Sequence, residues 1–184
     1  MAKAFILWWL LLSLSACAGA VPSAIESQKG ESSMLLTSPA FREGNTVPTD
    51  HTCDGKDSSP EIAWSGAPDG TKSFALICDD PDAPRGTWVH WVIFDLPPTT
   101  AKLASGIAPD RELSQGGKQG KNDFGKIGYG GPCPPPGKPH RYYFKLYALD
   151  TMLNLQPGAT KQQVEQAMKG HILAEGTLMG KYGR

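Results

Sequence analysis

The chain has 184 residues, of which 40% are hydrophobic and 20% charged, a composition typical of one ordinary globular domain. Lysine plus arginine equals aspartate plus glutamate at 18 each, so no net field draws the protein toward nucleic acid or an acidic membrane. Its 21 glycines and 16 prolines favour a loop-rich β protein over a helical one.

The first 16 residues have the features of an export signal. Lys3 supplies the positive charge, and Phe5–Leu12 forms an apolar run that is too short to span a bilayer as a mature helix. The motif Leu-Ser-Ala-Cys that ends at Cys17 resembles the bacterial lipobox, in which the cysteine is lipidated and becomes the new N-terminus. We therefore predict a lipoprotein signal peptide over residues 1–16 and lipid attachment at Cys17. Ordinary cleavage a few residues later, without a lipid, is the alternative.

Residues 17–33 are small, polar and aperiodic after the cysteine, which predicts a flexible tether. The folded domain is expected to cover residues 34–184. Ala18 follows the cysteine in place of a sorting aspartate, which favours the outer membrane. We expect a protein of the bacterial cell envelope that faces the periplasm or the exterior.

Apolar and β-branched segments separated by turn residues predict several short strands. Their sequences are MLLTSPAF from Met34, EIAWS from Glu61, SFALICDD from Ser73, TWVHWVIFDLP from Thr87, RYYFKLYALD from Arg141 and an edge strand GTLMGKY from Gly176. Residues 99–127 contain polar and glycine clusters without a sustained period, which predicts a long surface excursion.

One helix is predicted over residues 161–170. Thr160 caps its start, Gln163 completes a capping box, and Gly170 ends it. Strands without βαβ alternation exclude a parallel sheet. The fold class is therefore mainly β, an antiparallel β-sandwich of two sheets of Greek-key type with a peripheral C-terminal helix.

The segment Gly128–Tyr142 contains nine glycines and prolines among fifteen residues, which predicts a loop of defined shape. It ends in His140 and Tyr142, which share one face if the following run is a strand. This arrangement is typical of the wall of a binding pocket. A crossover loop whose histidine and tyrosine only pack explains the same pattern equally well.

Two further positions attract attention. Pro81 pushes Asp80 toward extended geometry, which places Asp80 and Asp82 on the same side of the chain, although a polar turn has the same composition. His90 lies in the middle of a strand that is apolar on both faces, so a buried histidine with a structural partner is the alternative to a site residue.

Other chemistry is not supported by the sequence. It contains no Gly-x-Ser-x-Gly elbow, P-loop or dinucleotide fingerprint, and no close Cys/His spacing for zinc, so we predict neither cofactor nor metal. Cys53 and Cys133 lie in loops, whereas Cys78 lies inside an apolar strand. We expect a disulfide between Cys53 and Cys133, which closes a loop of about 80 residues, and a reduced Cys78.

The motifs DPDAP, TWVHWVIFDLP and GYGGPCPPPGKPHRYYFKLYALD resemble the two signature regions of the phosphatidylethanolamine-binding protein family, in its bacterial Raf-kinase-inhibitor-like branch. The resemblance extends over nearly all of Met34–Arg184 and implies a β-sandwich with a small pocket for anionic groups. It also implies a cis bond between Ala83 and Pro84. The pocket residues that it implies are Asp80, Asp82, His90, His140 and Tyr142, with Pro84 shaping the pocket and Tyr182 near its mouth.

Three functions are compatible with these features. The first is a lipid-anchored binding protein for phosphate-bearing ligands such as phospholipid head groups, acting as a regulator of a kinase or protease, as the family implies. Its partners would be the ligand, the membrane through the N-terminal lipid and an unidentified protein target, but no nucleic acid. The alternative is a metal-dependent or acid/base enzyme that uses the Asp/His cluster. The third is a scaffold with a vestigial pocket.

Overall fold

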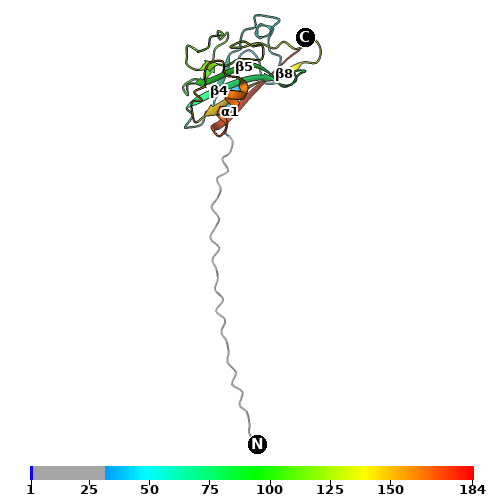
Figure 1. Ribbon diagram of the computed structural model, residues 1–184. Helices are drawn as coiled ribbons and strands as arrows, with labels where there is room; N and C mark the ends of the chain where they lie inside the picture. The colour runs from blue at the N-terminus through cyan, green and yellow to red at the C-terminus, as the bar shows by residue number, and fades with distance from the viewer. Residues whose placement is uncertain (2–31) are drawn as a thin grey trace.

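The computed structural model describes Met1 and residues 32–184, which form the domain in Figure 1. The predicted signal peptide, the lipid attachment site Cys17 and most of the predicted tether lie outside the described residues. Within the described part of the chain, no helix is both long enough and apolar enough to span a membrane.

Two sheets build the domain. The larger has the strand order β1-β9-β8-β4-β5-β7, antiparallel except for the β1·β9 pair, and the smaller is an antiparallel sheet with the order β2-β3-β6. The large-sheet strands are β1 (Ser32–Ser33), β4 (Ser73–Asp80), β5 (Trp88–Leu96), β7 (Lys118–Gln119), β8 (His140–Leu149) and β9 (Ile172–Tyr182). The small-sheet strands are β2 (Leu35–Thr37), β3 (Ile62–Ser65) and β6 (Lys102–Leu103). A long connection from β5 to β8 returns the chain beside β4, as Greek-key topologies require. The predicted mainly β sandwich is confirmed.

The two faces of the large sheet contribute to two separate cores. One face packs against the small sheet and contributes Leu76, Trp91 and Phe144. The other contributes Ile77 and Val92 and is covered in part by the helix α1 (Lys161–Met168), which lies in front of the sheet in Figure 1. Every residue of β4 is buried because this central strand is covered on both sides.

Helix α1 has the predicted cap. The Thr160 side chain accepts from the Gln163 N–H, and the Gln163 side chain accepts from the Thr160 N–H, which satisfies two N–H groups at the start of the helix. Val164 and Met168 are buried against the sheet, and Gly170 follows with a φ of +80°, a conformation that favours glycine.

Two strands extend beyond the predicted ones. Ser32 and Ser33, which precede the predicted first strand at Met34, pair with Ala174 and Glu175 of β9. Strand β9 begins at Ile172, before the predicted start at Gly176, and β1 covers part of its outer edge. A Cβ on Gly176 would lie 2.5 Å from the Met34 carbonyl oxygen, so this glycine permits the close approach of the N-terminal segment.

Residues 99–127, predicted as a surface excursion, are partly buried. They contribute β6 and β7, and Gln119 is fully buried. Its amide accepts from the Trp91 indole N–H at 2.8 Å and donates to the Ala108 and Asp110 carbonyls. A polar side chain can be buried here because all its groups are satisfied.

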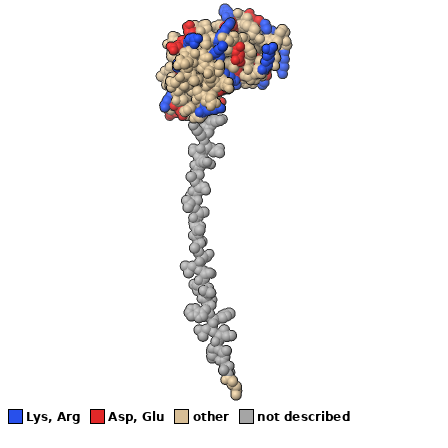
Figure 2. All heavy atoms as spheres, viewed as in Figure 1, with Lys and Arg blue, Asp and Glu red and all other residues tan. Residues whose placement is uncertain are grey.

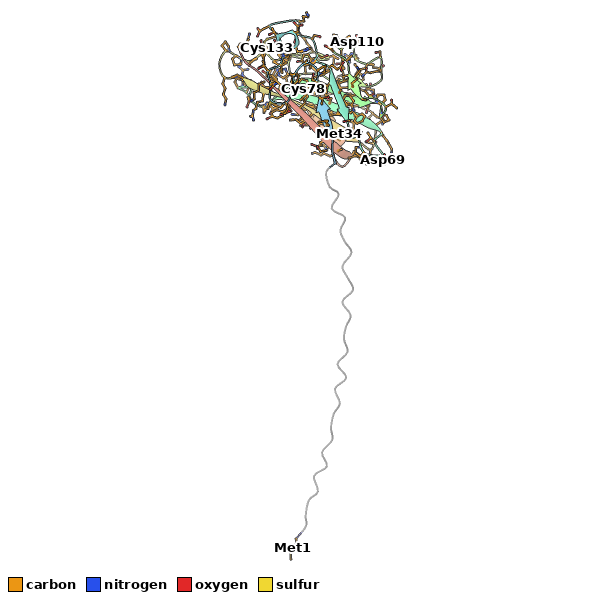
Figure 3. The ribbon with its side chains drawn as sticks, turned by 180° about the vertical axis from the view of Figure 1, so that it is seen from behind. Met1, Met34, Asp69, Cys78, Asp110 and Cys133 are labelled. Carbon is orange, nitrogen blue, oxygen red and sulfur yellow. A yellow bond between two sulfur atoms is a disulfide. The ribbon has the colours of Figure 1, made fainter. Side chains whose placement is uncertain are left out.

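The domain has two distinct ends along β9. Its N-terminal half pairs with Ser32 and Ser33, whereas its last residue, Tyr182, pairs with His140 at the start of β8. Figure 3 shows Met34 and Cys133 at opposite ends of the domain. The loops around Cys133 and the start of β8 therefore lie far from the point at which the chain enters the domain.

Candidate functional site

A pocket of about 330 Å³ opens at the end of the large sheet where β8 begins. It is lined by Asp80, Ala83, Pro84, Arg85, Trp88, His90, Phe124, Cys133, Pro134, Pro135, His140 and Tyr142. The lining combines apolar rings with a few polar groups, as small-molecule sites usually do. Five of the seven predicted site residues line it, namely Asp80, Pro84, His90, His140 and Tyr142.

Asp80 and His140 form the polar centre of the pocket. Asp80 is the last residue of β4 and His140 the first of β8, and the His140 Nδ1 lies 2.7 Å from the Asp80 Oδ2. The other oxygen of Asp80 accepts from the Asp82 N–H at 2.8 Å. Since a carboxylate accepts, the His140 Nδ1 donates to it. Nε2 of His140 makes no hydrogen bond within residues 32–184 and is available to a ligand.

His90 enters the pocket from the middle of β5. Its Nδ1 lies 2.6 Å from the Gly130 carbonyl oxygen, so Nδ1 carries the proton and donates. Burial lowers the pKa of His90, although the Gly130 carbonyl favours the charged form. The ring is therefore neutral near pH 7, and its Nε2 presents a lone pair. His90 is an acceptor, whereas His140 beside a carboxylate is suited to be a donor.

Tyr142 completes the polar part of the wall. Its ring lies edge-on to His90, with centroids 5.1 Å apart, and its buried hydroxyl has no hydrogen-bond partner in the described part of the chain. Burial, followed by the charge of Asp80, raises the pKa of the phenol well above its usual value. The hydroxyl thus remains a neutral donor, and an unpaired buried donor is costly unless a ligand or water satisfies it.

Asp82 does not line the pocket. Its carboxylate accepts from Nε and Nη2 of Arg141 at 2.9 and 2.7 Å, and from the Arg141 backbone N–H. These bonds hold the pKa of Asp82 at about 2. The two aspartates share a turn, as predicted, but only Asp80 lines the pocket. Asp82 instead fixes the start of β8 through Arg141.

Pro84 lines the pocket with a trans peptide bond. The described residues contain no cis peptide bond, so the cis Ala83–Pro84 bond that the family resemblance implied is wrong. The Gly86 N–H donates to the Ala83 carbonyl at 3.1 Å, which makes Pro84 the second residue of a β-turn. A trans proline fits that position, whereas a cis proline belongs at the third.

Tyr182 lies beside the pocket rather than in its lining. Its hydroxyl donates to Asp54 at 2.8 Å, and the neighbouring Arg184 Nε donates to the Pro134 carbonyl at 2.8 Å. These two hydrogen bonds therefore join residues 182–184 to Asp54 and to the proline-rich loop. Tyr182 acts on the pocket wall and not on a ligand in the pocket.

The expected disulfide between Cys53 and Cys133 is present, with Cα atoms 5.4 Å apart, and Cys78 is a free, buried thiol. Neighbouring contacts join the same two loops. The Tyr129 hydroxyl donates to the His51 carbonyl, and the Gly131 N–H donates to Asp57 at 2.6 Å. The proline-rich wall that contains Cys133 is therefore fixed on both sides.

Three lining residues with large side chains were missed in the sequence. Arg85 is exposed at the pocket and forms no ion pair with another described residue. Trp88 and Phe124 form an edge-to-face pair with centroids 5.5 Å apart. Arg85 directly follows the DPDAP motif, and Trp88 shares a predicted strand face with His90. The sequence could therefore have indicated both as site residues. Phe124 lies in the 99–127 segment, where no pattern indicated a site.

Among residues 32–184, no three or more His, Cys, Asp or Glu side chains gather closely enough to hold a metal ion. The ionisable side chains of the pocket are two imidazoles, one carboxylate, one phenol and one guanidinium, and Trp88 adds an indole N–H. Such a set can hydrogen-bond an anion through its donors and a donor group through the lone pair of His90.

Known proteins share both the sequence and the fold. The family model described as "Phosphatidylethanolamine-binding protein" matches residues 37–183. A UPF0098 protein of Methanothermobacter thermautotrophicus is 51% identical over 151 residues, covering 82% of this chain and 99% of that protein. A UPF0098 protein of Aquifex aeolicus is 51% identical over 157 residues, covering 84% of this chain and 91% of its own length.

Two solved structures have the same architecture. A putative phosphatidylethanolamine-binding protein homologue from Chlamydia trachomatis has a TM-score of 0.76 and 42% identity, and the match covers 84% of this chain and 99% of that one. E. coli YbcL, described as a new member of the mammalian family, has a TM-score of 0.76 and 35% identity, over 82% and 98% of the two chains. The chain belongs to the phosphatidylethanolamine-binding protein family.

Proposed function

We propose that the protein is a binding protein whose pocket takes a small phosphate-bearing ligand, such as the head group of a phospholipid. One observation carries this proposal most directly. The hydroxyl of Tyr142 and Nε2 of His140 both belong to the pocket wall, and neither has a hydrogen-bond partner among the described residues. The phenol is a donor, and Nε2 of His140 is a second donor in the imidazolium form of the ring, so the pair favours a ligand with several acceptor oxygens.

The charges around the pocket fit such a ligand. Nδ1 of His140 donates to Asp80, so in the imidazolium form of the ring Nε2 can donate a charge-assisted hydrogen bond to a phosphate oxygen. Arg85 adds a further positive charge at the lining. Both oxygens of the Asp80 carboxylate accept hydrogen bonds, one from His140 and one from the Asp82 N–H. These donors partly offset its negative charge beside the anion.

His90 and the aromatic rings suit the other end of a zwitterionic head group. The neutral Nε2 of His90 accepts a hydrogen bond, and Trp88 and Phe124 offer ring surfaces that attract an ammonium group. A ligand with both an anionic and a donor group would thus use every polar group of the lining. Regulation of a kinase or protease would be a separate consequence of this binding.

Calorimetric titration of O-phosphorylethanolamine tests the proposal. The substitution His140→Ala removes the charge-assisted hydrogen bond and should cost roughly 1.5–3 kcal/mol of binding free energy, with the domain still folded. His171→Ala is a matched control because His171 also pairs with an aspartate, Asp150, at 2.8 Å, but outside the pocket. Unchanged affinity in His140→Ala, or equal losses in both variants, would refute the pocket as the phosphate site.

We also propose that Cys17 bears a lipid that holds the domain at the outer membrane of the cell envelope. The lipobox-like motif before Cys17 supports this. The domain would then present its pocket at the end away from Ser32, where the described chain begins. Cys17→Ser should move the protein from the membrane fraction to the soluble fraction, and unchanged membrane fractionation would contradict the lipid anchor.

A further inference from the structure

Two additional hollows continue the pocket along the start of β8. The first, of about 310 Å³, shares Pro135 and His140 with the pocket and adds Lys138. The second, of about 530 Å³, shares Lys138 with the first and adds Lys181. The three spaces are neighbours in a row along this edge, because each shares lining residues with the next.

Positive charge follows this row. Arg85 in the pocket, Lys138 between the two hollows and Lys181 in the outer hollow form no ion pair with any residue between 32 and 184. In Figure 2, Lys and Arg side chains project from the end of the domain where Figure 1 marks the C-terminus. The one carboxylate that lines both hollows, Asp82, is neutralised by Arg141.

The register of the strands concentrates this charge. Arg141 lies directly opposite Lys181 across the β8·β9 pair, and like charges in that position repel one another. Asp82 offsets only the charge of Arg141. The outer hollow therefore retains the positive charge of Lys138 and Lys181, which an anion placed between them would relieve.

We propose that this row is a second anion subsite and that the ligand carries two phosphate groups, one in the pocket and one between Lys138 and Lys181. This inference rests on the proposed function, since the first phosphate occupies the pocket at His140. A small bisphosphorylated molecule is favoured because the cations line hollows that continue the pocket. His140 borders both the pocket and the first hollow, so it lies between the two phosphates.

A matched pair of sugar phosphates tests the second subsite. Fructose 6-phosphate has one phosphate, and fructose 1,6-bisphosphate adds a second on the same scaffold. The bisphosphate should bind wild type roughly fivefold more tightly, beyond the twofold expected statistically, because exposed ion pairs are each worth about a 1.4- to 5-fold change. This advantage should shrink when the ionic strength is raised, because exposed charges are screened.

The double variant Lys138→Gln/Lys181→Gln should lose the bisphosphate advantage while binding fructose 6-phosphate within about twofold of wild type. Lys72→Gln is the control, because Lys72 is exposed and its N–H bonds to Leu149 at the far end of β8. It should change neither affinity.

Three outcomes would overturn the subsite. The first is equal affinity of wild type for the two sugar phosphates, with monophosphate binding intact, which leaves the proposed function standing. The second is a bisphosphate advantage that survives the double substitution. The third is binding to phosphatidylglycerol vesicles that depends on Lys138 and Lys181 without any bisphosphate advantage, which assigns the row to a membrane surface. Failure of both sugar phosphates and O-phosphorylethanolamine to bind would refute the proposed function as well.

Discussion

Asp79 and Asp80 are neighbours in β4, yet their carboxylates lie in opposite regions of the molecule. Side chains alternate along a strand, so Asp80 faces the pocket and Asp79 faces the side of α1. Asp79 accepts from two ammonium groups, those of Lys145 and Lys161, whereas Asp80 has one imidazole and a backbone N–H. Both carboxylates are buried. The difference lies in the partners. Both partners of Asp79 are lysines that donate to Oδ2, and Oδ1 lies 2.9 Å from the Lys145 ammonium without a hydrogen bond. The partner of Asp80, His140, lines a cavity and has a second ring nitrogen without a partner among the described residues.

Burial of an aspartate does not by itself identify a site. Two permanent cations hold Asp79 in a cluster that joins β4, β8 and the first residue of α1. Asp80 is hydrogen-bonded to the imidazole of His140, which lines the pocket. The first carboxylate should therefore control stability and the second should control binding.

The substitution Asp79→Ala should have the largest effect on stability. It leaves Lys145 without its anion and Lys161 with only the more exposed Glu165 at 3.6 Å, and should destabilise the domain by about 3 kcal/mol, as measured by urea denaturation. Glu61→Ala is the control, because it removes the more exposed Lys102–Glu61 pair, which should matter by less than about 1 kcal/mol. Losses of similar size in the two variants would show that the Asp79 cluster has no special role in stability.

The substitution Tyr142→Phe should lower ligand affinity without lowering the stability of the domain. The variant removes a buried hydroxyl that has no partner in the described chain, so stability should change by less than about 0.5 kcal/mol or rise slightly. Affinity for O-phosphorylethanolamine should fall about fivefold, the value of roughly one neutral hydrogen bond. Tyr147→Phe, on the outer face near α1, should leave the affinity unchanged. A clear loss of stability in Tyr142→Phe would indicate a structural role for the hydroxyl.

The smallest effect on stability is expected at Asp82, which belongs neither to the Asp79 cluster nor to the pocket lining. Its hydrogen bonds to Arg141 lower its pKa from 3.8 to about 2, so its contribution to stability is complete above about pH 4 and is lost as pH falls toward 2. Because the pair is partly exposed, the contribution should not exceed about 1 kcal/mol. Unfolding free energies of wild type and Asp82→Asn should therefore converge near pH 2. A difference that stays constant with pH would exclude this linkage.

Much of the fold follows from local sequence patterns. The apolar runs that became β4, β5 and β8 and the capping box at Thr160 were sufficient to predict the sandwich and its helix, because periodicity and caps are local signals. The short strand at Ser32 and Ser33 was not predicted, because two serines have no strand pattern and depend on pairing with β9. The role of Gly176 likewise depends on a long-range contact, the close approach of the Met34 carbonyl.

Sequence motifs and strand alternation predicted four of the polar residues that line the pocket. Asp80, His90, His140 and Tyr142 all line the pocket, whereas the separation of Asp82 from it depends on the long-range bond to Arg141. Phe124 reaches the pocket from a loop with no period, and contacts of that kind are set by tertiary packing. The trans bond at Pro84 follows from its place in a turn that only the folded chain shows.

Asp80 should promote anion binding through its hydrogen bond to Nδ1 of His140, which orients the ring in the pocket wall. Calorimetric titration of O-phosphorylethanolamine into wild type and Asp80→Asn, at pH 6 and pH 8, tests it most directly. Asp80→Asn should bind more weakly than wild type at both pH values, although a negative charge has been removed beside an anion site, because the neutral amide is a weaker acceptor for the hydrogen bond from His140 Nδ1. Tighter binding by Asp80→Asn would mean that the carboxylate only repels the ligand, and would contradict the account.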